Sequence, residues 1–289
     1  MTDLETDYRM VGIGEILWDL LPDGKQLGGS PMNVVYHCQA AGIKSVVVSA
    51  VGLDPDGDEI INLVKNKGNH TEFIQQLADR PTGTVSVELQ DGIPDFTIHK
   101  NVAWDKISWN DDLKRLAGTI DAVAFGSLAQ RDEVSRTTLR NFLGSMKEAS
   151  LKVFDINLRQ DYHSEEIIQS SLLSANILKI NDDELPVMAD YLKLQGSIKT
   201  IILKILDKFK LKLVAYTRGS KGSIIYSKNI ISVLPAPGVE IKDTVGAGDT
   251  FTAVLIAGLL NNKPLKQIHK EATAKAAYVC TQQGGTPGY

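Results

Sequence analysis

The chain has 289 residues, of which 43% are hydrophobic, and it carries a formal net charge of −4 at pH 7. This length and composition predict a globular protein with a large core, and the acidic balance gives no electrostatic basis for nucleic-acid binding. Residues 2–7 are polar where a signal segment would be apolar, and no run approaches the roughly 18 apolar residues of a membrane span, so we expect a soluble, cytoplasmic protein without a membrane partner. The two cysteines fall in predicted helices and the five histidines are scattered, which favours neither a disulfide framework nor a zinc site.

Short β-branched runs alternate with longer amphipathic runs along most of the chain. This alternation is typical of an α/β protein whose parallel sheet is flanked by helices. We expect helices near 31–41, 55–67, 133–149, 165–173, 183–192, 198–209, 247–260 and 265–282. Asp54 and Ser164 are placed to cap the helices that follow them. The expected strands lie near 10–17, 45–51, 122–125, 152–156, 177–180, 213–217 and 223–226.

One segment interrupts this alternation. Residues 84–89 and 95–101 read as two alternating strands, and the turn residues 90–94 between them predict a β-hairpin. From the residues alone, a surface hairpin without a role explains it equally well. Because no repeat, low-complexity tract or long linker divides the chain, we predict one domain over 1–289 with this hairpin inserted.

Two motifs lie near the N-terminus. The first expected strand runs through Gly12-Ile13-Gly14-Glu15-Ile16-Leu17-Trp18-Asp19, and Gly28-Gly29-Ser30-Pro31-Met32-Asn33 precedes the first helix. Ser30 as an N-cap and Pro31 at the first helical position would explain part of the second motif as a helix start. That interpretation leaves the glycine pair and Asn33 without a reason.

A glycine-rich motif, Asp243-Thr244-Val245-Gly246-Ala247-Gly248-Asp249-Thr250-Phe251, precedes an apolar helical run. Its glycines allow a sharp turn that exposes backbone N–H groups where a helix begins, which makes a cradle for an anion. Asp249 within this cradle is placed like a general base beside a phosphate. A turn in which Asp249 only caps the helix is the alternative.

Three further motifs follow predicted strands. Arg159 closes Asp155-Ile156-Asn157-Leu158-Arg159 and would meet an anion or a hydroxyl-rich ligand, or else form a surface ion pair. The acidic run Asn181-Asp182-Asp183-Glu184 opens a helix, where it also suits the helix dipole. The loop Thr217-Arg218-Gly219-Ser220-Lys221-Gly222 is weak evidence for a nucleotide site by itself.

Together these motifs resemble ribokinase-like (PfkB) sugar kinases, and the resemblance runs from Asp19 to Gly284. It implies a three-layer α/β sandwich with a mostly parallel central sheet and a small β-sheet lid built from about 20–27 and 84–101. It makes Asp249 the base, and the amides of Gly246, Ala247 and Gly248 the groups that stabilise the transferred phosphoryl group. The implied sugar-binding residues are Asp19, Gly28, Gly29, Asn33, Phe96 and Arg159.

The resemblance also implies sites for ATP and for cations. The nucleotide would contact Asn181, Glu184, Thr217, Gly219, Gly222 and Thr273, and Glu184 would act on Mg²⁺ through water. A potassium site, found in several members of the family, would be formed by Asp243 and by the carbonyl groups of Val245, Val279, Gln282 and Gly284. The lid would offer an exposed sheet edge through which two copies of the chain could pair.

The function that the resemblance implies is ATP-dependent phosphorylation of a sugar. The motifs look most like those of bacterial fructokinases, which predicts transfer to O6 of fructose, and a 2-keto-3-deoxygluconate kinase is the alternative because Arg159 would also suit a carboxylate. A noncatalytic sugar-sensing protein on this fold stays open, although it would not need Asp249. Leu17 in place of the third glycine of G-x-G-x-x-G argues against a dinucleotide-dependent oxidoreductase, and the absence of G-x-x-x-x-G-K-[ST] argues against a P-loop kinase.

Overall fold

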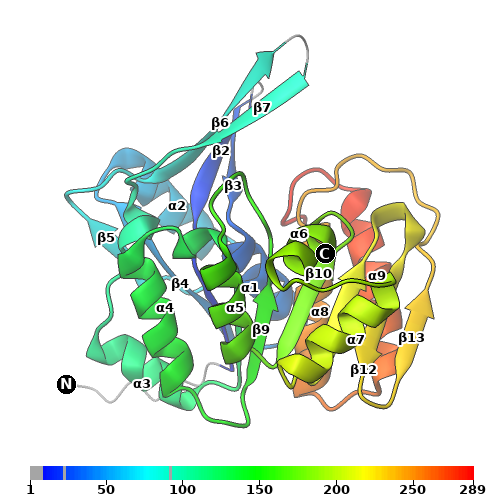
Figure 1. The fold of residues 1–289 in the computed structure, drawn as a ribbon. Helices are drawn as coiled ribbons and strands as arrows, with labels where there is room; N and C mark the ends of the chain where they lie inside the picture. Colours follow the sequence, from blue (N-terminus) through cyan, green and yellow to red (C-terminus); the bar gives the residue numbers. More distant parts are fainter. Residues whose placement is uncertain (1–8, 22–23, 91–92) are drawn as a thin grey trace.

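The computed structural model describes residues 9–21, 24–90 and 93–289, and Figure 1 shows their arrangement. In this part of the chain a nine-stranded sheet, ordered β13-β12-β11-β10-β9-β8-β1-β4-β5, forms the centre of the molecule. The strands are β1 (Met10–Ile13), β4 (Ser45–Gly52), β5 (Ile74–Leu77), β8 (Ala122–Phe125), β9 (Leu151–Asp155), β10 (Ile177–Asn181), β11 (Leu213–Thr217), β12 (Ser223–Ser227) and β13 (Ile231–Leu234).

Helices cover both faces of this sheet (Figure 1). On one face lie α1 (Ser30–Ala40), α2 (Pro55–Asn66), α8 (Ala247–Leu260) and α9 (Leu265–Cys280). On the other lie α3 (Asp111–Thr119), α4 (Glu133–Ser145), α5 (Glu165–Ser174), α6 (Glu184–Tyr191) and α7 (Ile198–Lys208).

The apolar character of the strands follows from this double cover. All eight residues of β4 are buried, and they alternate between the two cores: Val46 and Val48 pack toward the face of α3 to α7, whereas Val47 and Val51 pack toward α1 and α8. Successive side chains of a strand point to opposite faces, so a strand between two helical layers must be apolar at nearly every position. The predicted three-layer α/β fold with a mostly parallel sheet is confirmed.

A second sheet stands beyond one end of the first. It contains β2 (Leu17–Leu21), β3 (Gly24–Gly28), β6 (Gly83–Gln90) and β7 (Ile93–Ile98), in the order β3-β2-β6-β7. The pairs β2–β3 and β6–β7 are antiparallel, and β2–β6 is parallel. In Figure 1, β6 and β7 project past the helical layers at the top of the view.

The predicted single strand over 10–17 is wrong, because the chain passes there from one sheet to the other. β1 ends at Ile13, and Gly14 takes a φ of 148°, a conformation that glycine adopts readily. The Ser49 hydroxyl donates to the carbonyl oxygen of Gly14 over 2.6 Å. The chain then continues as β2 of the small sheet.

Two of the predicted helix N-caps are confirmed, and a third is wrong. Asp54 and Ser164 accept backbone N–H groups at the N-termini of α2 and α5, as predicted. Ser30 is not an N-cap, because helix α1 begins at Ser30 itself and Gly29 occupies the cap position. The Ser30 hydroxyl is used elsewhere, in a contact with Asp249.

Three elements of the main sandwich were not predicted: β5, α3 and β13. β5 and β13 are the edge strands of the large sheet, and each has only four residues. In β13, Ile231 and Val233 are exposed. Short edge strands carry too little periodicity to be recognised.

Candidate active site

Several predicted site residues, among them Arg159, Asn33 and Asp249, lie in segments that follow the carboxyl ends of strands or open helices. The chain runs from β1 outward to β4 and β5, then returns to β8 and continues outward to β13, so the direction of the strand order reverses between β1 and β8. In an open parallel sheet, loops leave such a point on both sides and create a crevice for a ligand. The β1–β2 turn, the start of α1 and the loop after β9 lie at this edge (Figure 1).

Asp249 lies in the first turn of α8 and is held by the first turn of α1. Its Oδ1 accepts the Ser30 hydroxyl over 2.6 Å, and its Oδ2 accepts the Asn33 amide over 2.8 Å. These residues are more than 200 positions apart in the chain. The two glycine-rich motifs therefore form one polar site.

The backbone before Asp249 requires glycine. Gly246 occupies the left-handed region with a φ of 76°, and a Cβ at this position would lie 2.5 Å from Cα of Gly285. Both conditions exclude other residues. The turn opens α8, where the N–H of Ala247 donates to the carbonyl oxygen of Thr244 over 3.3 Å and the N–H groups of Gly248 and Asp249 have no partner within the helix.

Asp19 lies beside the glycine pair on β2. A Cβ on Gly28 would collide with the Asp19 carboxylate, so glycine at 28 leaves this carboxylate its space. Burial raises the pKa of Asp19 to about 6, and the nearby Arg159 guanidinium opposes this shift. Asn33 is 5% exposed, and its buried side-chain Oδ1 has no partner among the described residues.

Arg159 and Phe96 are both exposed. Arg159 donates to the carbonyl oxygen of Leu158 over 2.9 Å and forms no ion pair within the described part of the chain. The positive charge of Arg159 opposes the rise in the pKa of both Asp19 and Glu15, so Arg159 lies near these two carboxyl groups. Phe96 lies on β7, and its carbonyl oxygen accepts the amide of Gln160, next to Arg159.

Sequence reasoning missed Glu15, which is 3% exposed at the turn between β1 and β2. Burial raises the pKa of its carboxyl to about 7; the N–H of Ser30 donates to this group, and the field of Asp249 adds to the upward shift. Its Oε2 has no partner among the described residues. An acidic residue after an apolar strand was the signal, but nothing local shows that the next residues turn it inward.

A cavity of about 520 Å³ borders the glycine-rich turn. Apolar groups of the 236–241 segment and of α9 form much of its wall. Five of the six predicted nucleotide-binding residues line it together with Gly248: Asn181, Thr217, Gly219, Gly222 and Thr273.

Glu184, the sixth, lies behind this wall with its carboxylate engaged. The carboxylate accepts the N–H of Asn181 over 2.8 Å and that of Leu158 over 3.3 Å, while the Asn181 side chain accepts the N–H of Glu184 over 2.8 Å. This reciprocal pattern fixes the start of α6. The acidic first turn thus has a structural role of its own.

Asp243 holds the glycine-rich turn to the C-terminal segment. Its Oδ1 accepts the N–H of Val245 and its Oδ2 that of Gly284, both over 2.9 Å. The carbonyl oxygen of Val279 accepts the N–H of Gln282 over 2.9 Å. Of the residues predicted to bind potassium, Asp243 therefore contacts Val245 and Gly284, and Val279 contacts Gln282.

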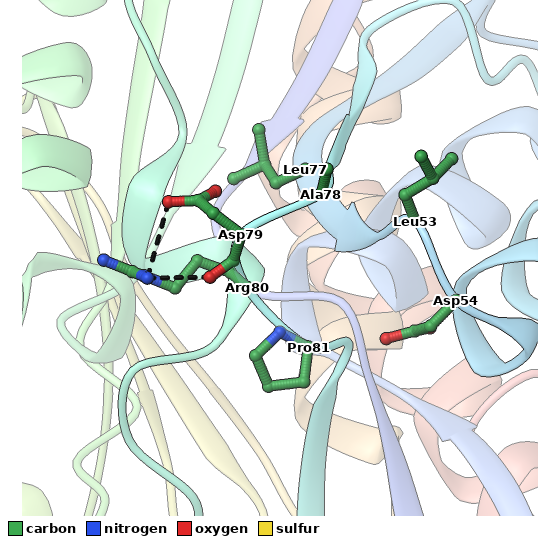
Figure 2. Close-up of a pocket in the computed structure, with 7 residues that line it drawn as sticks. All are labelled: Leu53, Asp54, Leu77, Ala78, Asp79, Arg80 and Pro81. Carbon is green, nitrogen blue, oxygen red and sulfur yellow. Dashed lines mark hydrogen bonds and ion pairs between the residues drawn. The ribbon is translucent and has the colours of Figure 1, made fainter.

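A second cavity, of about 310 Å³, lies between the β4–α2 loop and the segment before β6, and shares no residue with the first (Figure 2). The Asp54 carboxylate at its wall accepts N–H groups from Gly57 and Thr82. Arg80 donates to the carbonyl oxygen of Asp79. The polar groups of this cavity are therefore largely occupied by structural contacts.

Within the described ranges, no group of three or more His, Cys, Asp or Glu side chains is arranged to hold a metal ion. The same ranges contain no helix that is long and apolar enough to cross a membrane.

Comparison with known proteins supports the motifs. The family model described as pfkB family carbohydrate kinase matches residues 23–288. The chain is 30% identical to a Pyrococcus horikoshii protein described as "putative sugar kinase PH1459", covering 96% of this chain and 91% of that protein. It is 28% identical to an Arabidopsis thaliana protein described as "probable fructokinase-5", covering 96% of this chain and 93% of that protein. The structure of PH1459 in complex with ATP superposes with a TM-score of 0.82 at 29% identity, covering 96% of this chain and 94% of that one.

Proposed function

The chain belongs to the pfkB family of carbohydrate kinases, and on this premise we propose that it transfers the γ-phosphoryl group of ATP to O6 of fructose, with Asp249 as the base. One observation carries the proposal. Asp249 is hydrogen-bonded to Asn33 on one side, and the residue before it, Gly248, lines the 520 Å³ cavity. A sugar on the first side and ATP in the cavity would meet at the glycine-rich turn.

The residues then have separate tasks. Asp249 takes the proton of the sugar hydroxyl, since its two hydrogen bonds to Ser30 and Asn33 hold it in one orientation. Gly246, Ala247 and Gly248 direct backbone N–H groups toward the charge of the transferred group. Asp19, Gly28, Gly29, Asn33, Phe96 and Arg159 bind the sugar, and Asn181, Glu184, Thr217, Gly219, Gly222 and Thr273 serve the nucleotide.

Cations fit this site in different ways. Mg²⁺ would supply neutralisation of phosphate charge when it is bound, and an ion that keeps several waters and phosphate ligands needs few ligands from the protein. Glu184 would act on it through water. Each Asp243 oxygen accepts one N–H and retains a further lone pair, which suits K⁺ beside the carbonyl groups of Val245, Val279, Gln282 and Gly284.

Fructose rests on the fructokinases among the relatives and on the site itself. Asp19 and Asn33 suit the neutral hydroxyl groups of a ketose. The alternative substrate is 2-keto-3-deoxygluconate, since Arg159 has no ion-pair partner in the described chain and would bind a carboxylate. We further propose that the small sheet is a lid over the sugar, that its exposed edge supports a homodimer, and that the enzyme is cytoplasmic.

The deciding experiment measures ATP turnover of the purified protein with Mg²⁺ on fructose, other ketoses, pentoses, nucleosides and 2-keto-3-deoxygluconate. The highest kcat/KM on fructose is expected. A preference for 2-keto-3-deoxygluconate would make this sugar acid the substrate, and the assignment as a kinase would stand. Sugar binding without turnover of any compound would favour a noncatalytic sugar-sensing protein.

Asp249→Asn tests the base in the same assay. The amide preserves the shape of the carboxylate but cannot accept the proton, so we expect kcat to fall by roughly 10²–10⁴-fold. Sugar affinity measured by calorimetry should stay within a few fold. Turnover near that of the wild type would show that Asp249 is not the base.

A further inference from the structure

A buried lysine lies beneath the glycine-rich turn, in a strand that sequence reasoning treated as apolar. Lys179 of β10 is 6% exposed. Its Nζ lies 3.0 Å from Oδ1 of Asp155 on β9, and Oδ2 of Asp155 accepts the hydroxyl of Thr252 from α8 over 2.9 Å. The ammonium group is therefore fixed between the central sheet and α8.

The ammonium lies against the first turn of α8. A Cβ on Gly248 would lie 2.9 Å from Nζ of Lys179 and 3.6 Å from its Cε. Lys179 also lines the 520 Å³ cavity together with Asn181, Thr217 and Gly219. A positive charge thus borders both the N–H groups that begin α8 and the space proposed for the nucleotide.

The surroundings keep this lysine protonated. Burial by itself lowers the pKa of Lys179, but the carboxylates of Asp155, Glu184 and Asp249 raise it above its ordinary value. Asp155 is hydrogen-bonded to it, while Glu184 and Asp249 act through their fields. Because Lys179 also lines the cavity, its ammonium is the positive group among these carboxylates that a phosphoryl group there would meet.

We propose that Lys179 is a catalytic residue of the phosphoryl transfer, and that its ammonium group contacts the transferred phosphoryl oxygens. The inference rests on the proposed kinase activity. In the step, the sugar oxygen forms a bond to the γ-phosphorus while the bond from this phosphorus to the bridging oxygen breaks. The hydroxyl proton passes to Asp249, ADP leaves with the electron pair, and Lys179 stays protonated throughout.

The geometry accounts for the partners of Lys179. Asp155 and Thr252 hold the ammonium toward the cavity without closing it off, because Lys179 borders that cavity. Gly248 leaves room for the ammonium beside the helix start. A fixed positive group aimed at developing charge stabilises a transition state without reorganisation at the moment of reaction.

The experiment compares wild type, Lys179→Met and the control Lys204→Met, whose lysine is exposed and donates to the carbonyl oxygen of Gln195. Binding of AMP, ADP and the nonhydrolysable analogue AMPPNP is measured by calorimetry, and kcat by ATP turnover. Lys179→Met should lower kcat by roughly 10²–10³-fold and weaken AMPPNP by at least tenfold, with AMP affinity within twofold of the wild type. Lys204→Met should leave all four quantities unchanged.

Equal losses for AMP and AMPPNP would show a structural ion pair and overturn the proposal, as would a kcat within threefold of the wild type. If wild type turns over no sugar, the proposed function fails, and the nucleotide titrations still test Lys179 by themselves.

A measurement on the wild type covers the case in which Lys179→Met does not fold. In a ¹⁵N-lysine NMR spectrum, the Nζ signal of Lys179 is identified as the one missing from Lys179→Arg, which retains the charge. This signal should move with AMPPNP and stay in place with AMP. Equal movement with both nucleotides, or none, would overturn the proposal.

Discussion

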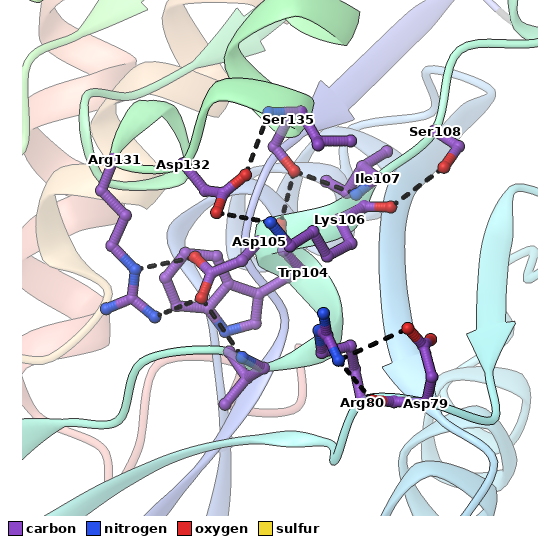
Figure 3. A network of polar contacts seen from close by, with 12 residues as sticks. Asp79, Arg80, Trp104, Asp105, Lys106, Ile107, Ser108, Arg131, Asp132 and Ser135 are labelled. Carbon is purple, nitrogen blue, oxygen red and sulfur yellow. Dashed lines mark hydrogen bonds and ion pairs between the residues drawn. The ribbon is translucent and has the colours of Figure 1, made fainter.

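Two buried ion pairs in this protein have similar burial and different surroundings. The side chains of Lys179 and Asp155 are 8% and 5% exposed, and those of Arg131 and Asp105 are 6% and 3% exposed. Arg131 donates to both carboxylate oxygens of Asp105, over 2.7 and 3.0 Å, as Figure 3 shows. Only the Lys179 pair borders the 520 Å³ cavity.

The Arg131 pair is enclosed by protein. Its guanidinium lies 4.0 Å from the ring centre of Trp104 and 4.7 Å from that of Tyr162, and donates to the carbonyl oxygen of His99 at the end of β7. Asp105 accepts the N–H of Val102 over 3.2 Å. These contacts join the base of the small sheet to the segments after β8 and β9. Burial of a charge pair thus does not identify a functional site by itself, and the Lys179 pair differs in lying against both the cavity and the glycine-rich turn.

The largest expected effect on stability comes from Arg131→Ala. Removing one partner leaves the Asp105 carboxylate buried and unpaired, which costs about 3–5 kcal/mol in the free energy of unfolding. Urea denaturation measures this loss. The control is Arg115→Ala, because Arg115 and its partner Asp112 are 71% and 66% exposed and such pairs contribute at most about 1 kcal/mol. If Arg131→Ala were stable but inactive, the enclosed pair would belong to the active site.

A buried carboxyl without an ionic partner offers the next comparison. Glu15 has a pKa raised from 4.5 to about 7, so the folded state holds a proton that the unfolded state releases between these values. Its contribution to stability is therefore present below about pH 4.5 and is lost as the pH rises through 7, on the order of 3 kcal/mol in total.

Glu15→Gln removes this titration. Relative to the wild type, the free energy of unfolding of the variant should gain on the order of 3 kcal/mol between pH 4.5 and pH 8, measured by urea denaturation at each pH. A difference between the two proteins that does not vary with pH would show that folding does not raise the pKa of Glu15.

The smallest effect concerns the space beside Lys179. Gly248→Ala would place a methyl group 2.9 Å from its Nζ, and the flexible lysine would have to move. We expect kcat to fall roughly tenfold, about 1.4 kcal/mol in the activation barrier, with stability within about 1 kcal/mol because alanine favours the helix. Gly118→Ala is the control, since no atom lies within 4 Å of its Cβ position and activity should not change. An unchanged kcat in Gly248→Ala would show that the position of the Lys179 ammonium does not matter for the reaction.

The sequence by itself determined the features that depend on local pattern. Alternation of strands and helices predicted the parallel sheet, because apolar periodicity follows from burial on one or two faces. The glycine at 246 was recognised because a left-handed turn before a helix needs it, and Asp249 was recognised from its place inside that turn. Asp54 and Ser164 were recognised as caps for the same local reason.

Only the tertiary structure decided how distant segments share these groups. Ser30 was predicted to cap its own helix, but its hydroxyl bonds to Asp249, 219 residues further along the chain. The role of Lys179 depends on Asp155 and Gly248, which lie far from it in the chain. Glu15 is buried because the chain turns at Gly14 from one sheet to the other, and this turn follows from the pairing of distant strands. A periodic pattern reports how much of a side chain is buried, whereas the partner that makes a buried charge tolerable is chosen by packing between elements.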